Sequence, residues 1–342
     1  MRAAAFGVPP DGVESRPQVR RRRPVPLPRK FDAMKKFLSA AFAALALAAA
    51  FVVGPSAAQT PAPKATAQKG SAAAKSTAGA PRDTLARLKA SGQINVAFSG
   101  DSLPFSFVDA KQQPAGYSID LCKRVIAQLG RAAGVPDLKV NWVVGTVSER
   151  LAMVASGKAD LECANTTATQ TRMMTVDFSS LVFLDGGGLI AKGAAVQKFS
   201  DLAGKNIGVI AGTTTETRLE SVLKARLVNA KVVKVKDGNE GIAMLESGSL
   251  DAFASDKIKL FGLALQAKDP KALAMLPDDL SIEPLAFALP RGDSSFRLEV
   301  NRALTQVYVG GEIEPIFNQW LGTLGRPSGL LAAMYLLNAI PQ

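Results

Sequence analysis

The sequence predicts an α/β fold with two lobes joined by a two-strand hinge. From Thr84 onward, short runs rich in β-branched residues alternate with helical patterns, which is typical of βαβ units and parallel sheets. A second observation is an internal repeat. Twice, an apolar helix ends at a glycine, Gly157 or Gly248, and a short loop with Asp leads into a strand. The repeat favours two similar, Rossmann-like lobes.

Hydrophobic periodicity predicts the individual elements. Runs of alternating or continuous apolar residues bounded by polar turns predict strands, and apolar residues that recur on one helical face predict helices. The predicted strands are 94–98, 138–144, 207–210 and 250–254, and the predicted helices are 116–130, a helix from near Thr215, 295–309 and a terminal helix over 313–320 that packs back on the first lobe.

The chain is predicted to cross between the lobes twice, near residues 184–189 and near residues 283–288. The first crossing contains the glycine run 186–188, and glycine tolerates the φ/ψ changes that a hinge absorbs. A chain that crosses twice makes the first lobe discontinuous. The predicted boundaries are 83–187 plus 286–342 for the first lobe and 188–285 for the second lobe.

An export signal precedes these lobes. Lys35 and Lys36 form a basic n-region, residues 37–53 an apolar h-region, and small residues precede a cleavage site before Gln59. Met34 is the expected start, and an uncleaved anchor is the alternative. We therefore expect residues 1–58 to be a leader with a cleaved signal peptide and the mature protein to be periplasmic. Residues 59–82, rich in Ala, Pro, Thr, Lys and Ser, are an expected disordered linker.

The charge of the chain does not indicate nucleic-acid binding. The formal net charge is +12 over 342 residues, but residues 1–58 hold 10 of the 41 Lys and Arg and only 3 of the 29 Asp and Glu. Most of the excess therefore lies in the expected leader. The arginine run 20–23 has no interleaved aromatic residues, so we expect no nucleic-acid partner.

Cysteine and histidine usage excludes several enzyme classes. The sequence has no histidine, which removes Ser-His-Asp and Cys-His sites, and its two cysteines alone make a poor zinc site. We expect no metal, no cofactor and no catalysis. Cys122 lies on the apolar face of a predicted helix and Cys163 in an apolar strand, so a disulfide and two buried thiols are both open.

Several short motifs follow one another in order between about Thr84 and Trp320. They are Leu103-Pro104-Phe105-Ser106-Phe107, Gly116-Tyr117-Ser118-Ile119-Asp120, Glu162-Cys163-Ala164-Asn165-Thr166-Thr167 with Arg172, Ala211-Gly212-Thr213-Thr214 and Leu245-Glu246-Ser247-Gly248. Their order and spacing resemble a known family, the periplasmic amino-acid-binding proteins of ABC importers (bacterial solute-binding protein family 3), especially the glutamate/aspartate-binding type. The resemblance implies the type II periplasmic-binding-protein fold and a monomer that hands a free amino acid to a membrane permease.

A free amino acid needs a cationic and an anionic partner in a closed cleft, because its carboxylate and ammonium both lose water there. Arg172 can bind the α-carboxylate with two parallel N–H bonds, beside the strand end at Asn165 and Thr167. Thr213 stands at a helix start, where unpaired N–H groups favour the same anion. The family resemblance assigns the ammonium to Asp256.

Four other positions bear on the ligand side chain. In the resembling acidic-ligand proteins an arginine that matches Arg150 meets the distal carboxylate. Those proteins place a second arginine where this sequence has Ser99 and a histidine where it has Gly238. The expected ligand is therefore glutamate, aspartate or one of their amides. Phe105 is expected to form an apolar wall of the pocket.

Two other classes of protein compete with this interpretation. A periplasmic lyase such as cyclohexadienyl dehydratase has a similar fold and needs a carboxylic acid of raised pKa in the cleft, for which Glu162 and Glu149 are the nearby candidates. A chemoreceptor or kinase sensor needs a spanning helix, and no apolar stretch after the leader approaches about 20 residues.

Overall fold

The computed structural model describes residues 83–341, so the predicted leader and linker lie outside the described residues. Within this range one sheet has the strand order β5-β1-β6-β12-β7-β10-β8-β9, with β11 paired to β7. A smaller sheet has the order β2-β3-β4. The strands are β1 (Gln93–Phe98), β2 (Asp101–Ser102), β3 (Ser106–Val108), β4 (Pro114–Ala115), β5 (Lys139–Val144), β6 (Leu161–Cys163), β7 (Val176–Lys192), β8 (Asn206–Ile210), β9 (Lys231–Val235), β10 (Ala252–Asp256), β11 (Leu273–Met275) and β12 (Ser281–Pro290).

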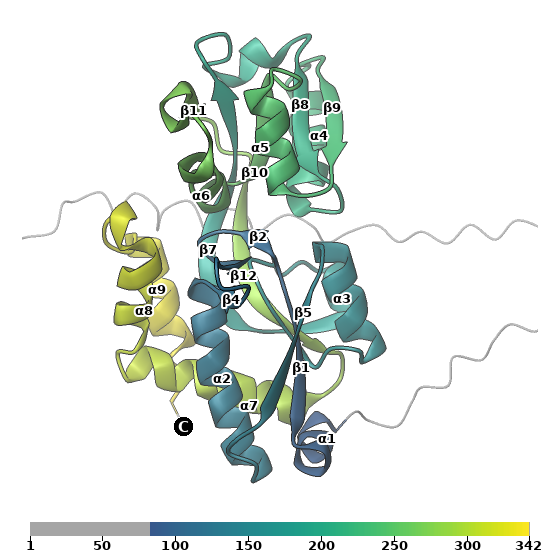
Figure 1. Ribbon diagram of the computed structural model, residues 1–342, viewed down its shortest axis with the longest axis vertical. Coiled ribbons are helices and arrows are strands. Elements are labelled where there is room, and N and C mark those ends of the chain that lie inside the picture. Colours follow the sequence, from purple (N-terminus) through teal and green to yellow (C-terminus); the bar gives the residue numbers. More distant parts are fainter. Residues whose placement is uncertain (1–82, 342) are drawn as a thin grey trace, which may run out of the picture. The chain divides into compact units, whose positions relative to one another are not determined.

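Helices cover both faces of the large sheet (Figure 1). Polar side chains cap several of them. Thr146 and Glu149 form a reciprocal capping box at α3, and the Asp237 side chain accepts a hydrogen bond from the backbone N–H of Glu240 in the first turn of α5. No helix within residues 83–341 is both long and apolar enough to span a bilayer. The helices are α1 (Thr84–Ser91), α2 (Tyr117–Ala133), α3 (Val147–Ser156), α4 (Thr214–Ala225), α5 (Gly238–Glu246), α6 (Lys257–Gln266), α7 (Ser294–Val309), α8 (Ile313–Leu321) and α9 (Gly329–Asn338), with short 3-10 helices at Arg172–Met174, Phe199–Leu202, Pro270–Ala272 and Gly322–Leu324.

The strand directions confirm the predicted α/β fold. β1 pairs in parallel with β5 and β6, and β8 pairs in parallel with β9 and β10. These two groups of parallel strands are joined by β7 and β12, which pair with each other in antiparallel fashion. We use the names first lobe and second lobe for the predicted ranges 83–187 plus 286–342 and 188–285.

The hydrophobic cores on the two sides of β7 and β12 are built from different segments. One set of buried residues extends from Leu88 to Phe183 and resumes from Leu285 to Tyr335. Two other sets lie between Leu189 and Leu280. The chain therefore leaves the first core, builds the second, and returns to complete the first.

The glycine run in β7 is explained by close packing. A Cβ atom on Gly188 would lie 2.8 Å from the Lys257 side chain, and one on Gly187 would overlap the Ser281 hydroxyl of β12. Neither glycine has a positive φ. Hinge freedom at these glycines stays a prediction, and the structure shows a second requirement, because glycine lets α6 and β12 approach the β7 backbone.

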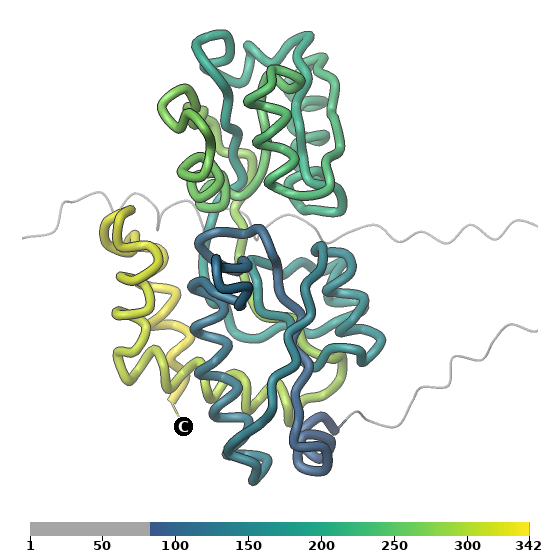
Figure 2. The backbone as a smooth tube through the Cα atoms, in the orientation of Figure 1, coloured from purple at the N-terminus to yellow at the C-terminus, as the bar shows by residue number. Residues whose placement is uncertain are grey.

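The C-terminal helices pack on the first lobe. The predicted helices over 295–309 and 313–320 are present as α7 and α8, and Trp320 of α8 donates its indole N–H to Asp120 of α2 over 2.7 Å. Helix α9 was not predicted. It begins after the capping residue Ser328 and lies beside β7 and α7 at the yellow end of the tube in Figure 2.

The two cysteines form a disulfide. Cys122 of α2 and Cys163 of β6 are bonded, with their Cα atoms 6.1 Å apart. The alternative of two buried thiols is therefore wrong. The bond fixes the end of β6, the strand that leads directly into Asn165 and Thr167.

Candidate functional site

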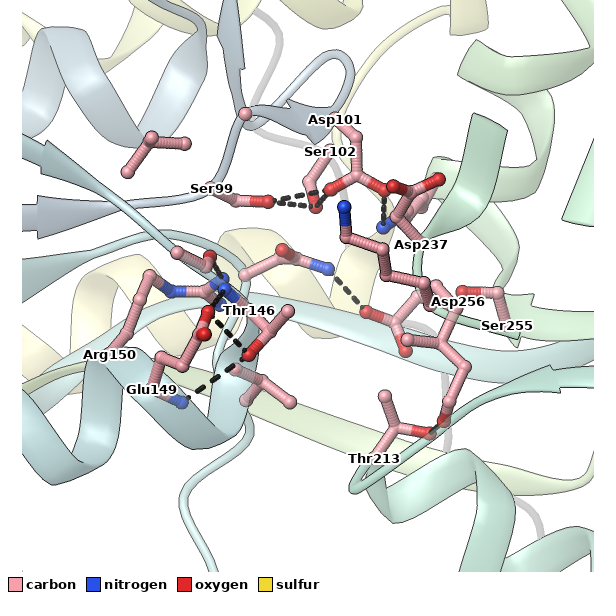
Figure 3. Close-up of a pocket in the computed structure, with 18 of the residues that line it drawn as sticks. Ser99, Asp101, Ser102, Thr146, Glu149, Arg150, Thr213, Asp237, Ser255 and Asp256 are labelled. Carbon is pink, nitrogen blue, oxygen red and sulfur yellow. Dashed lines mark hydrogen bonds and ion pairs between the residues drawn. The ribbon is translucent and has the colours of Figure 1, made fainter. Parts of the chain in front are cut away.

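A cavity of about 470 Å³ lies at the carboxyl ends of the parallel strands and receives side chains from both lobes (Figure 3). This is the usual position of ligand sites in α/β proteins. Seven of the eight residues proposed from the sequence line it. The lining residues are Ser99, Gly100, Asp101, Ser102, Val144, Gly145, Thr146, Val147, Glu149, Arg150, Asn165, Thr167, Arg172, Ile210, Thr213, Thr214, Lys236, Asp237, Asn239, Ser255, Asp256 and Lys259.

Arg172 is half-buried at the start of a short 3-10 helix, with its guanidinium in the cavity lining. Its Nη1 donates to the Thr167 carbonyl over 2.8 Å, the one hydrogen bond that this guanidinium makes within residues 83–341. Burial lowers the pKa of the guanidinium, while the charges of Glu162, Asp256 and Glu283 oppose this. A guanidinium has five N–H donors, so four remain for an anion.

Asp256 ends β10 and precedes α6, but its side chain does not cap that helix. Instead, it accepts a hydrogen bond from the Asn165 amide of the first lobe over 2.7 Å. Burial and the nearby Glu283 raise the pKa of Asp256 to about 6, against the lowering effects of Asn165, Lys259 and Arg172. A ligand ammonium would compensate this buried carboxylate.

Thr213 is the N-cap of α4. Its hydroxyl accepts from the Glu216 N–H over 3.1 Å and donates to the Ile210 carbonyl over 2.7 Å. The expected contact of Thr213 with the ligand carboxylate was through N–H groups at the helix start. Because capping uses the hydroxyl in both directions, the helix-start N–H groups are the part of this turn that suits an anion.

Glu283 of β12 was not proposed from the sequence, and its carboxylate accepts hydrogen bonds from hydroxyl groups of both lobes. It is 2% exposed. Its Oε2 accepts from Thr167 over 2.6 Å and from Thr214 over 2.9 Å, and its Oε1 accepts from Ser281. Thr167 therefore uses its hydroxyl to bind Glu283 and its backbone carbonyl to bind Arg172. No local sequence signal marks Glu283, because it sits within an apolar strand.

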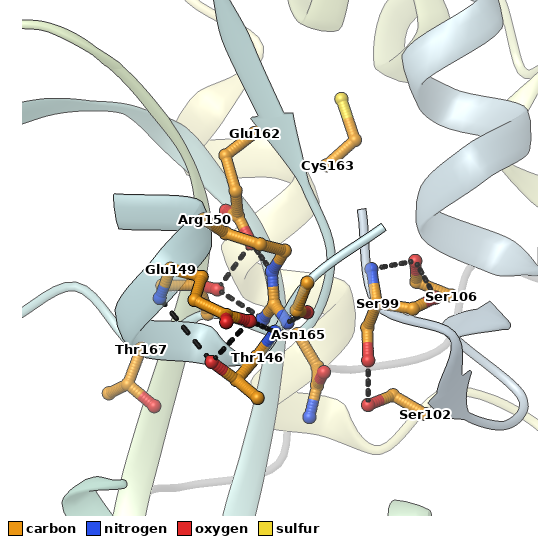
Figure 4. Close-up of polar contacts among 12 residues, drawn as sticks. Ser99, Ser102, Ser106, Thr146, Glu149, Arg150, Glu162, Cys163, Asn165 and Thr167 are labelled. Atoms are coloured by element: carbon orange, nitrogen blue, oxygen red, sulfur yellow. Dashed lines mark hydrogen bonds and ion pairs between the residues drawn. The ribbon is translucent and has the colours of Figure 1, made fainter. Parts of the chain in front are cut away.

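Arg150 lies in a buried ion pair. Its Nε donates to Glu162 over 2.7 Å, Nη1 donates to the Gly145 carbonyl over 2.7 Å, and Nη2 donates to Thr166 over 3.3 Å (Figure 4). The other carboxylate oxygen of Glu162 has no hydrogen-bond partner within residues 83–341. Two of the five N–H donors of Arg150 thus have no partner among the described residues, and its charge is balanced by Glu162.

Ser99 and Gly238 face the same carboxylate. The Ser99 hydroxyl donates to Asp101 Oδ1 over 2.9 Å, and the Gly238 N–H donates to Asp101 Oδ2 over 2.6 Å. Lys259 of α6 also donates to Oδ2, over 2.9 Å. Burial alone would raise the pKa of Asp101, but Lys259, Gly238 and Ser99 lower it to about 2. Figure 3 shows Ser99 and Ser102 pointing toward Asp101.

Phe105 lies in the core and is absent from the cavity lining. It is 0% exposed and packs edge-on against Tyr117 and Phe183, with ring centroids 6.1 and 5.0 Å away. The prediction that Phe105 forms the pocket wall is therefore wrong. Phe105 lies in the turn between β2 and β3, outside both strands, so apolar alternation does not tell whether its ring meets the core or the cavity.

The polar groups of the cavity do not form a metal site. Within the described part of the chain, no three His, Cys, Asp or Glu side chains are placed to hold one metal ion. The cavity instead offers separate cations and carboxylates, an arrangement that suits a small zwitterion.

Comparisons with known proteins place the chain in a family. Residues 94–323 match the bacterial extracellular solute-binding proteins, family 3. The chain is 33% identical to the L-glutamate/L-aspartate-binding protein of Pseudomonas aeruginosa over 249 residues, which cover 72% of this chain and 82% of that protein. The chain therefore belongs to the family 3 extracellular solute-binding proteins.

Two solved structures share the fold. An ancestral arginine-binding protein bound to glutamine has 27% identity and a TM-score of 0.61, covering 68% of this chain and 98% of its own. An ancestral amino acid-binding protein described as a precursor of cyclohexadienyl dehydratase has 28% identity and a TM-score of 0.60, covering 70% and 99%. These similarities confirm the type II periplasmic-binding-protein fold that the sequence predicted.

Proposed function

We propose that this protein captures a free polar or acidic L-amino acid outside the cytoplasm and delivers it to the membrane permease of an ABC importer. The observation that carries the proposal is that Arg172 from the first lobe and Asp256 from the second lobe line the same cavity. Each has hydrogen-bonding capacity left for a ligand. The family and the named relatives support the same conclusion.

The two lobes hold the two charged groups of the ligand from opposite sides. Arg172 and the N-terminal turn of α4 bind the α-carboxylate, and Asp256, held by Asn165, binds the ammonium. Since these groups come from both lobes, the ligand interacts more favourably with the closed arrangement than with an open one. The permease then recognises the closed form.

The proposal includes a periplasmic location through the cleaved signal peptide, a monomeric state and no catalytic activity. The alternative is a periplasmic lyase, which the dehydratase precursor among the similar structures brings forward. That enzyme requires a carboxylic acid of raised pKa. Hydrogen bonds from the Thr146 backbone and hydroxyl lower the pKa of Glu149, so Glu149 does not fit this requirement. Glu162 is paired with Arg150 and lies outside the cavity lining.

A thermal-shift screen tests the proposal. The purified protein is unfolded and refolded to remove bound ligand, and its melting temperature is measured with each common L-amino acid and with prephenate. A ligand at 100 times its Kd adds about 2.7 kcal/mol of stability, which moves the melting temperature visibly. We expect a shift with at least one of glutamate, aspartate, glutamine and asparagine. No shift with any amino acid would contradict the proposal, and turnover of prephenate would replace it with the lyase.

A further inference from the structure

The part of the cavity around Asp101 is built on a carboxylate. Two neutral residues, Ser99 and Gly238, both donate to Asp101. A ligand carboxylate placed beside Asp101 would therefore meet a like charge. The only ion-pair partner of Asp101 within residues 83–341 is Lys259, over 2.9 Å.

Gly238 makes room for Lys259. A Cβ atom on Gly238 would lie 2.9 Å from Lys259 Cε, 2.7 Å from Leu263 Cδ1 and 3.1 Å from Asp101 Oδ2. Contacts this short displace the neighbour, so a larger residue at position 238 and the present position of Lys259 exclude each other. The absence of a side chain at 238 and the Asp101–Lys259 pair are thus parts of one arrangement.

The charges in the cavity leave no buried cation for a second carboxylate. Four acidic and four basic residues line it among the described residues. Arg150 is balanced by Glu162, and Lys259 is balanced by Asp101. Arg172 is the partner proposed for the α-carboxylate. The remaining basic residue, Lys236, is exposed, so its ammonium is hydrated.

The Asp101–Lys259 pair offers both kinds of hydrogen-bonding group. The Lys259 ammonium has three donors, and within residues 83–341 one of them is used, on Asp101. Oδ1 of Asp101 accepts from Ser99 at 2.9 Å and only weakly from Ser102 at 3.5 Å, so it retains a lone pair. Free donors and a free acceptor lie side by side.

We propose that Asp101 and Lys259 form the side-chain subsite and that it takes a carboxamide, as in L-glutamine or L-asparagine. The amide NH2 donates to Asp101, and the amide oxygen accepts from Lys259. A carboxylate in the same place would accept from Lys259 but would lie against the charge of Asp101 with no proton to share. This inference rests on the proposed function and narrows its ligand class.

The first test compares each amide with its acid by isothermal titration calorimetry on the refolded, ligand-free protein near neutral pH. L-glutamine and L-glutamate have the same shape, as do L-asparagine and L-aspartate, so the ratio of their Kd values reports the subsite. We expect the amide that binds to do so at least about tenfold more tightly than its acid. An acid that binds as tightly as its amide, or a cationic amino acid as the tightest ligand, would overturn the inference.

Two variants should move the acid-to-amide Kd ratio in opposite directions. Asp101→Asn leaves Lys259 without its anion, so the ratio should fall at least about fivefold. Lys259→Met leaves Asp101 without its cation, so the ratio should rise. A ratio that stays constant in both variants would overturn the inference, and a melting curve without ligand verifies that each variant is folded.

Matched controls come from second-lobe ion pairs outside the cavity lining. Asp278 pairs with Arg226 over 2.7 Å and accepts a backbone N–H from Phe199, much as Asp101 does from Gly238, so Asp278→Asn controls for Asp101→Asn. Lys205 pairs with Asp251 over 3.3 Å, so Lys205→Met controls for Lys259→Met. Both controls should keep the wild-type ratio. If no amino acid binds the wild type, the proposed function fails; if amino acids bind without preference for amides, only the subsite fails.

Discussion

The two proposed parts of the binding site differ in what they require of a ligand. Under the proposed function, Arg172 and Asp256 form a shared end, because they bind groups that every free amino acid carries. Asp101 and Lys259 form a side-chain end, because they bind the part in which amino acids differ. Under this proposal the shared end recognises the ligand class, whereas the side-chain end selects one amino acid within it.

The largest effect is expected at the shared end. Arg172→Ala should weaken amino-acid binding by about 2–5 kcal/mol, because the ligand carboxylate would be left buried without its charged partner. Titration calorimetry with the best ligand measures the loss. Arg218→Ala is the matched control, since the Arg218 side chain also donates to a backbone carbonyl, that of Leu280 over 2.7 Å, but lies outside the cavity lining. Binding of the Arg172 variant within a factor of two of wild type would remove it from the site.

A smaller effect at the same end depends on pH. The ammonium needs an ionised Asp256, whose pKa in the ligand-free protein is about 6, so Kd should rise as pH falls below that value, by up to about tenfold per pH unit. Titrations between neutral and mildly acidic pH measure this slope. A Kd that is constant across this pH range would show that Asp256 does not bind the ligand ammonium.

The same shift has a consequence for stability. The folded-state pKa of Asp256 is raised above its ordinary value of 3.8, so its contribution is most favourable below that pH and is lost as pH rises through about 6. Asp256→Asn should therefore stabilise the ligand-free protein at alkaline pH, on the order of 1 kcal/mol, while it abolishes tight binding. Denaturant unfolding of the variant and the wild type compares the two at this pH.

The smallest effect is expected at the side-chain end. Gly238→Ala places a methyl group against Lys259 and Leu263, and should weaken binding of the preferred ligand by about 1 kcal/mol without altering its pH dependence. Gly322→Ala is the control, because its Cβ would meet only Asn318 at 3.8 Å. An unchanged Kd in the Gly238 variant would show that Lys259 is not held against the ligand by this packing.

Local sequence patterns could place some of the cavity residues but not others. Arg172, Asn165 and Thr213 lie at strand ends or helix starts, so local patterns mark them, and all three line the cavity. Asp101 and Lys259 are 158 positions apart and meet only across the two lobes, so no local pattern pairs them.

Phe105 and strand β10 show what hydrophobic periodicity does not predict. Phe105 was predicted to form the pocket wall, but it is buried in the core. It lies in the turn before β3, so no strand periodicity orients its ring. The two-lobed fold was predictable because its helices and strands repeat with clear periods. Strand β10 was nonetheless shifted, beginning at Ala252 in place of residue 250 and including Asp256.

The disulfide has a consequence for proteolysis. Cys122 and Cys163, 41 positions apart, close a covalent ring that contains α3 and Arg150. A protease that cuts the backbone once inside this ring produces two new chain ends but no loss of mass until the bond is reduced. The cavity wall that carries Arg150 is therefore fastened to the protein at both ends, so one backbone cut cannot release it.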